Sequence, residues 1–193
     1  SCHVLFNLVD LVLVGRFGEE AVAGVHVAST VGFLPMIVGN GIGVATMALI
    51  AQSLGAGDRG EARTISSWSQ AFTLSVGVML GLALAMIAGP IVDWHGIGGE
   101  ARTYGYQYLV VSSLGTFSMF ALMQCTTTMR ALGEAWMPFA LLVAANVLNL
   151  ALNIPMMFGW EALGFAGWGP VGAAWASIIA RLLAAGVGYW WIA

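Results

Sequence analysis

Long apolar runs alternate along this chain with short polar or glycine-rich breaks. A helix needs about 20 mostly apolar residues to cross the hydrocarbon core of a membrane. Five complete runs and a shorter one at the start have this pattern, so the sequence predicts six membrane helices. Their predicted ranges are 1–23, 25–52, 67–92, 104–129, 138–158 and 169–192.

The composition agrees with an all-α integral membrane protein. Hydrophobic residues make up 60% of the 193 positions, charged residues 8%, and the mean hydropathy is +0.89. A soluble domain carries about 25% charged residues, so this chain has too few to cover a surface that faces water. The net charge is −3 and lysine does not occur, which argues against a nucleic-acid partner. Cys2 and Cys125 both lie in apolar runs, where we expect buried thiols.

The arginines predict the orientation, because cytoplasmic loops carry an excess of basic residues. Arg59, Arg63 and Arg130 follow the second and fourth predicted helices. Arg16 and Arg102 follow the first and third, in loops with an acidic excess. We therefore expect the even-numbered loops to be cytoplasmic.

One carboxylate, Asp10, lies deep within a predicted span. A charge at membrane depth is costly, so such a residue normally faces protein or water and has a function. The alternative is an aspartate near the lipid headgroups at a helix end, because Arg16 is only six positions further on.

Three amides, Asn146, Asn149 and Asn153, lie within about 60° of one another on the fifth predicted helix. Such a stripe is expected to face the bundle interior, either as part of a functional site or as hydrogen bonding that only holds helices together. Ser177 and Arg181 share a face of the sixth helix.

A rise of about 1.5 Å per residue places three of these polar groups at a similar depth, in the outer half of the membrane. Asp10 lies about 9 Å before Arg16, Asn153 about 8 Å below Phe158, and Ser177 about 12 Å below Gly169. Their oxygens would make a cation or proton site if the helices bring these faces together.

Motifs for enzymes and nucleotide binding are weak or missing. Gly55 to Gly60 has the literal G-x-G-x-x-G spacing, but it follows a membrane helix and no βαβ unit surrounds it. HExxH, GxSxG and CxxC spacings do not occur, which disfavours an intramembrane enzyme.

Five short motifs, in order, resemble the multidrug and toxic compound extrusion family. Residues 9–18 (VDLVLVGRFG) are similar to its first-helix signature, and residues 51–58 (AQSLGAGD) to the segment after its second helix. Residues 130–134 (RALGE), 149–155 (NLALNIP) and 169–177 (GPVGAAWAS) resemble its fourth loop, fifth helix and sixth helix.

This resemblance implies a transporter of twelve helices, in two six-helix lobes around a central cleft, that exports drugs or organic cations by proton or sodium antiport. Residues 1–193 would be the amino-terminal lobe, with a truncated first helix and a missing carboxy-terminal lobe as partner. We would expect no cofactor, and a location in the plasma membrane, as in a bacterial inner membrane.

The resemblance also implies roles for individual residues. The coupling cation, which could be sodium, would be bound by Asp10, Asn149 and Asn153. Ser177 stands where members of the family often have threonine and would support the same site. Tyr108 would line the substrate cleft. Many sodium-coupled members have aspartate where this chain has Asn153, so the coupling ion stays open. A flippase for lipid-linked saccharides from the same superfamily and a non-catalytic membrane scaffold remain as alternatives.

Overall fold

The computed structural model describes residues 13–159 and 167–192. Every element within those two ranges is a helix. After a short 3-10 turn, η1, come seven α-helices, α2 to α8. Their bounds are η1 Gly15–Phe17, α2 Glu19–Gly55, α3 Arg59–Met86, α4 Ala88–Trp94, α5 Gly99–Leu114, α6 Thr116–Ala131, α7 Trp136–Phe158 and α8 Pro170–Ile192.

The described helices agree with five of the six predicted spans. The helices α2, α3, α7 and α8 are each long and apolar enough to cross a membrane. The predicted span 104–129 corresponds to α5 and α6, which pass the same test as a pair bent by 42°. Most of the first predicted span lies outside the described residues.

Several predicted boundaries were wrong, and the largest difference is at the start of the third span, which was predicted at Ser67 but begins at Arg59. The first span was expected to reach Ala23, but the chain breaks at Gly18 and α2 begins at Glu19. The third span was expected to reach Val92, but α3 ends at Met86 and the short α4 follows after Ile87. Hydropathy misses the break at Ile87 because the residues on either side of it are apolar, whereas the break at Gly18 lies among the charged residues Arg16, Glu19 and Glu20.

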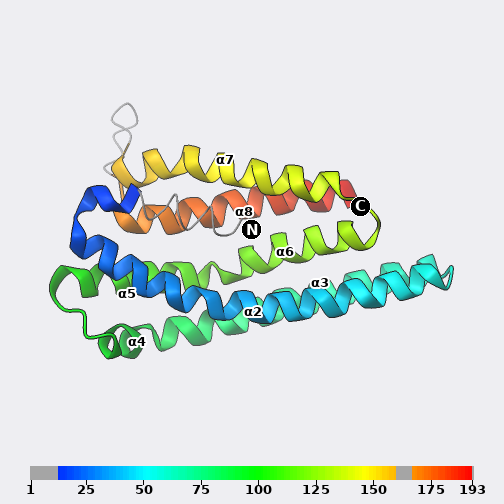
Figure 1. The fold of residues 1–193 in the computed structure, drawn as a ribbon, viewed down its shortest axis with the longest axis horizontal. Coiled ribbons are helices and arrows are strands. Elements are labelled where there is room, and N and C mark those ends of the chain that lie inside the picture. The colour runs from blue at the N-terminus through cyan, green and yellow to red at the C-terminus, as the bar shows by residue number, and fades with distance from the viewer. Residues whose placement is uncertain (1–12, 160–166, 193) are drawn as a thin grey trace.

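The long helices run side by side along the long axis of the molecule (Figure 1). The connections from α2 to α3 and from α6 to α7 lie at one end, and the connection from α4 to α5 lies at the other. Arg59, Arg63 and Arg130 are therefore at the end opposite Arg16 and Arg102. The separation agrees with the topology that the arginines predict.

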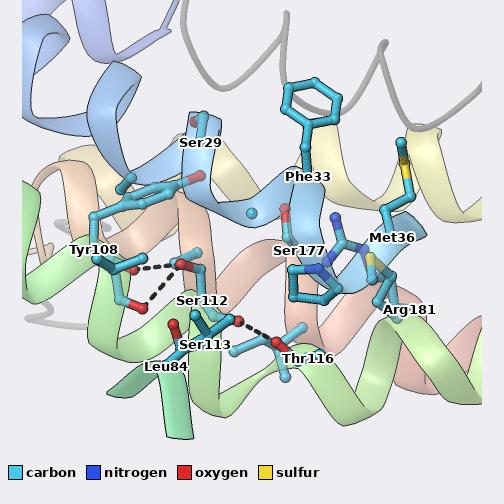
Figure 2. A pocket seen from close by; sticks show the side chains of 17 residues that line it. Ser29, Phe33, Met36, Leu84, Tyr108, Ser112, Ser113, Thr116, Ser177 and Arg181 are labelled. Carbon is cyan, nitrogen blue, oxygen red and sulfur yellow. Dashed lines mark hydrogen bonds between the residues drawn. The ribbon is translucent and has the colours of Figure 1, made fainter. Parts of the chain in front are cut away.

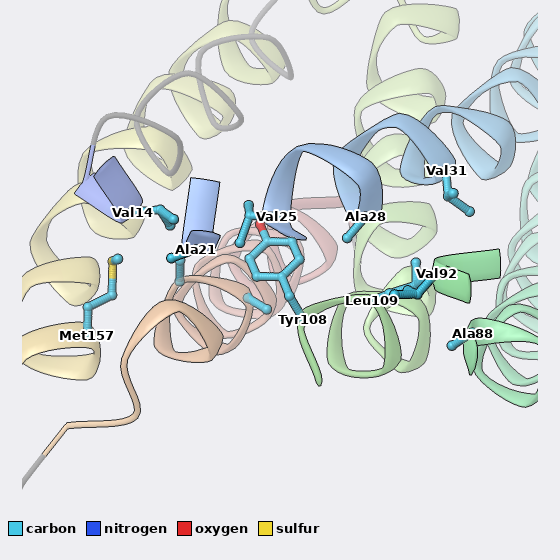
Figure 3. Packing of buried hydrophobic residues seen from close by; sticks show 12 residues of the cluster. Val14, Ala21, Val25, Ala28, Val31, Ala88, Val92, Tyr108, Leu109 and Met157 are labelled. Atoms are coloured by element: carbon cyan, nitrogen blue, oxygen red, sulfur yellow. The ribbon is translucent and has the colours of Figure 1, made fainter. Parts of the chain in front are cut away.

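The largest buried cluster joins α2 to α4, α5, α7 and α8 (Figure 3). Its members are Val14, Ala21, Val25, Ala28, Val31, Ala88, Val92, Tyr108, Leu109, Met157, Ala173 and Ala174. Gly24 lets α2 and α5 approach closely, because a Cβ there would meet the carbonyl oxygen of Ala101 and lie 2.7 Å from the nitrogen of Gly105. Small residues at helix contacts are the usual means of packing membrane helices.

Large apolar side chains also cover much of the outside of the bundle, as a surface that faces lipid requires. Leu34, Ile37 and Val44 of α2 are 58%, 65% and 66% exposed. Cys125 of α6 is fully buried and forms no disulfide, as expected for a buried thiol. Cys2 lies outside the described residues.

Candidate functional site

Two of the three predicted amides on α7 point into the bundle. Asn149 and Asn153 are 1% and 0% exposed, and Asn153 Nδ2 donates to Asn149 Oδ1 over 3.3 Å. Asn146 is only half-buried and donates to the carbonyl of Leu142, within its own helix, at 2.7 Å. The expected stripe of three is therefore a buried pair and one half-buried residue whose amide bonds within α7.

The pair reaches across to α8. Asn149 Nδ2 donates to Ser177 Oγ at 2.9 Å, and Ser177 is 5% exposed. The two helices can come this close because Gly172 of α8 has no side chain, and a Cβ there would overlap the carbonyl group of Met156. Asn153, Asn149 and Ser177 thus form one continuous chain of hydrogen bonds between α7 and α8.

This cluster offers oxygen ligands but little charge. Among residues 13–159 and 167–192, no three His, Cys, Asp or Glu side chains gather where they could hold a metal ion. The amide oxygen of Asn149 accepts a hydrogen bond from Asn153, and the hydroxyl oxygen of Ser177 accepts one from Asn149. Both are neutral oxygens of the kind that can act as ligands of a hard cation. Asp10, which would supply the negative charge, lies outside the described residues.

A small cavity adjoins the cluster where the α5–α6 pair bends. The bend falls at Gly115, and the side chains around it bond to their own backbone. Ser112 Oγ donates to the carbonyl of Tyr108 at 2.7 Å, and Ser118 Oγ donates to that of Gly115 at 2.7 Å. Ser113, which is 3% exposed, has no hydrogen-bond partner for its hydroxyl among the described residues. Hydroxyl groups are therefore concentrated at the bend.

The cavity has a volume of about 90 Å³ and is lined from α2, α3, α5, α6 and α8 (Figure 2). Such a space holds several water molecules but not a drug molecule. Tyr108, Ser177 and Arg181 surround it together with apolar side chains such as Phe33 and Met36. The structure therefore places the predicted cleft residue Tyr108 and the predicted ion-site residue Ser177 on the same cavity.

Tyr108 has two environments. It is 6% exposed and belongs to the largest apolar cluster, while also lining the cavity (Figures 2 and 3). Arg181, one turn after Ser177 on α8, brings a positive charge to the same space. The cavity is thus amphipathic, with one aromatic wall, several hydroxyls and one guanidinium group.

Sequence reasoning missed other polar contacts in the bundle. Thr73 of α3 donates to Gln124 of α6 at 3.3 Å. Gln70 of α3 donates to the hydroxyl of Tyr189 on α8, which in turn donates to the carbonyl of Ala121 at 2.7 Å. The available signal was the presence of two glutamines inside apolar runs, where an amide needs a partner.

Comparison with known families gives a specific match. The family model described as MatE matches residues 1–154. A probable multidrug resistance protein NorM of Thermotoga maritima is 27% identical over 187 residues, which are 96% of this chain and 39% of that protein. The chain therefore spans about two fifths of the length of this curated relative.

Solved structures show the same arrangement of helices. A MATE protein in its bent conformation matches with a TM-score of 0.90 and 26% identity, over 99% of this chain and 41% of that one. A transporter of the MOP superfamily from Pyrococcus furiosus matches with a TM-score of 0.87 and 26% identity, over 100% and 41%. The binding pocket of that transporter has reverse polarity, which suggests a different function for it.

Proposed function

Since this chain belongs to the MatE family, we propose that it is the amino-terminal lobe of a secondary active transporter that exports drugs or organic cations. Protons or sodium ions entering through the same protein would drive the export across the plasma membrane. The chain is a multi-pass membrane protein with no catalytic role in this proposal. The missing wall of the substrate cleft would come from a carboxy-terminal lobe, because transporter sites lie at the interface between repeats.

The observation that carries the proposal is the position of Ser177. It accepts a hydrogen bond from Asn149 in the buried cluster and also lines the cavity that contains Tyr108. Only the side chain of Ser177 would therefore separate a cation bound at the cluster from a cavity that can hold water. Coupling requires such a connection, since an ion drives transport only if the two conformations bind it with different affinity.

In this proposal Asp10 supplies the charge, while Asn149, Asn153 and Ser177 supply neutral oxygen ligands. Sodium favours oxygen ligands, and a carboxylate can exchange a cation for a proton when burial and charge change between conformations. Because Asn153 carries no charge, the proposed site has one carboxylate. Asn153→Asp would add a negative charge beside Asn149 and is expected to strengthen sodium dependence.

The test is Asp10→Asn in the full-length transporter, reconstituted in proteoliposomes under a controlled proton or sodium gradient. This change keeps the size of the side chain and removes its charge. We expect drug export to be lost while membrane insertion and abundance stay near the wild-type level. Export at the wild-type rate would contradict the assignment, and Asp10 would then be an interfacial residue.

A flippase for lipid-linked saccharides is the second candidate, and Arg181 is the residue that favours it. A guanidinium group in a membrane cavity is suited to a phosphate or pyrophosphate, to which it can donate two parallel hydrogen bonds. Arg181 is the one basic residue among the side chains that line the small cavity. Transport of a lipid pyrophosphate, together with failure to export a cationic dye, would support the flippase over the drug exporter.

A further inference from the structure

A second, larger cavity opens at the other end of the bundle, where α2 passes into α3. Its volume is about 880 Å³, within the range of about 300–1,000 Å³ that is typical of ligand sites. Side chains of α2, α3, α6 and α8 line it. We propose that this cavity binds the phosphodiester headgroup of an anionic phospholipid, with the acyl chains extending into the bilayer. The inference does not depend on the proposed transport activity.

Two arginines give the cavity its charge. Arg59 and Arg63 lie four residues apart, which puts them on the same face of the first turns of α3, and both line the cavity. Neither forms an ion pair or side-chain hydrogen bond within residues 13–159 and 167–192. Guanidinium groups bind phosphate oxygens with paired, charge-assisted hydrogen bonds.

Nearby acidic residues do not cancel this charge inside the cavity. Asp58 caps the start of α3, where its Oδ1 accepts a hydrogen bond from the backbone nitrogen of Glu61 at 2.8 Å. Neither Asp58 nor Glu61 belongs to the lining. The lining of the cavity therefore contains two positive charges and no negative one.

The inner wall supplies hydroxyl groups. Ser66 and Ser67 continue from Arg63 along α3, and Thr128 faces them from α6. Thr128 is 3% exposed, and its hydroxyl has no hydrogen-bond partner within the described part of the chain. The hydroxyl groups that a headgroup can reach in this cavity are therefore those of Ser66 and Ser67 on α3.

Apolar side chains favour a lipid over a soluble anion. Ile50 and Leu54 of α2, Leu132 after α6 and Ile192 of α8 line the same cavity. These side chains would pack against the glycerol backbone and the first acyl carbons of the lipid, next to the phosphate. This end of the bundle is the one that the arginines predict to be cytoplasmic, and basic pockets between membrane helices on that side suit anionic headgroups.

The experiment compares lipid retention by native mass spectrometry of the full-length protein in detergent. Phosphatidylglycerol and phosphatidylcholine are added in parallel, and inorganic phosphate and glycerophosphate serve as soluble competitors. The variant R59Q/R63Q is compared with Arg130→Gln. Arg130 lies at the same end of the bundle but outside the cavity lining, and its Nη2 donates to Thr127 Oγ1 at 3.3 Å.

We expect R59Q/R63Q to retain phosphatidylglycerol about tenfold less than wild type. Each of the two arginines adds to the affinity for an anionic lipid, and the variant removes both contributions. Arg130→Gln should change retention less than twofold, and phosphatidylcholine should bind weakly to every variant. An equal loss in Arg130→Gln, or equal binding of the two lipids, would overturn the proposal. Displacement of the lipid by inorganic phosphate at the same concentration would assign the cavity to a soluble anion and would overturn it too.

A second variant, Ser66→Phe, places a bulky apolar side chain on the cavity wall, one turn from Arg63, without removing either arginine. It should lower phosphatidylglycerol retention as strongly as the double arginine variant, with an unchanged net charge. This variant also decides the question if R59Q/R63Q does not fold. Wild-type retention by Ser66→Phe would show that the lipid binds elsewhere and would overturn the assignment.

Discussion

Asn149 on α7 donates a hydrogen bond to Ser177 on α8, with 2.9 Å between Nδ2 and Oγ. Both side chains are almost completely buried, in a bundle whose buried residues are mostly small or apolar. The contact ties together the two helices whose polar residues were predicted to share one depth. It can serve stability, ion binding or both, and these roles give different experimental results.

The structural role of this contact can be measured with a double-mutant cycle. Asn149→Leu and Ser177→Ala each remove one partner, and the double variant removes both. We expect a coupling free energy of about 0.6 kcal/mol, the average for hydrogen bonds between membrane helices. Equilibrium unfolding in mixed micelles measures it. A coupling near zero would mean that the contact contributes nothing to the association of α7 and α8.

The close approach of α2 and α5 predicts that alanine substitution lowers stability much more at one glycine of α2 than at another. A Cβ at Gly24 would meet backbone atoms of Ala101 and Gly105, which cannot move aside as a side chain can. Gly24→Ala should therefore destabilise the protein by about 1–3 kcal/mol, as overpacking does elsewhere. Gly41 of the same helix has nothing within 4 Å, so Gly41→Ala is the matched control. Equal melting temperatures for the two variants would contradict the packing of α2 on α5.

The sequence predicted most helices well because lipid imposes a simple rule. A segment that crosses the bilayer must be apolar and long, and α2, α7 and α8 follow from that rule within a few residues. The breaks at Ile87 and Gly115 were missed. Both lie inside apolar runs, where only the backbone geometry changes, and hydropathy does not record backbone geometry.

Sequence patterns likewise predicted one part of the candidate site and missed another. Helical periodicity placed Asn149 and Asn153 on one face, and both are buried. It also placed Asn146 there, but that side chain bonds to its own helix. Periodicity gives the face of a residue and does not show which positions on that face contact a neighbouring helix. The two cavities depend on how several helices pack together, so no pattern within one helix could predict them.

The topology can be tested by cysteine labelling on a background in which Cys2 and Cys125 are replaced by alanine. Gly60 lies at the start of α3, and Gly98 lies just before α5. These two connections are at opposite ends of the bundle in Figure 1. A membrane-impermeant maleimide should label Gly60→Cys only from the cytoplasm and Gly98→Cys only from outside. Labelling of both from one side would reject the six-helix topology.

An ion pair at the end of α4 gives a prediction about pH. Arg102 Nε donates to Asp93 Oδ1 at 2.6 Å, and this hydrogen bond, with the positive charge of Arg102, lowers the pKa of the Asp93 carboxyl below its usual value. A lowered pKa means that the stabilisation is present above the pKa of the unfolded chain and is lost as pH falls through the folded value. Both side chains are about half exposed, so the effect should be small and weakened by salt.

The check is the melting temperature of wild type and Asp93→Asn from pH 7 down to pH 3. The difference between them should shrink toward zero at the acidic end, and should already be smaller in high salt at pH 7. Asp93→Asn removes the charge but not the size of the side chain, so packing is unchanged. A difference that grows as pH falls would contradict the sign of the pKa shift.

The function of Ser177 is separated from its packing by a pair of variants of equal size. Ser177→Thr keeps the hydroxyl and adds a methyl group, while Ser177→Val has the same shape without the hydroxyl. Both variants introduce the same extra volume at a position that is 5% exposed, so steric cost is common to the two.

If the hydroxyl connects the buried amides to the cavity, Ser177→Thr should retain most ion-coupled export by the full-length protein. Ser177→Val should lose about tenfold, the rate equivalent of about 1.4 kcal/mol and within the range for one lost buried hydrogen bond. Drug flux in proteoliposomes at a fixed ion gradient measures both. Equal flux from the two variants, together with equal abundance, would show that the Ser177 hydroxyl serves only to hold α7 against α8.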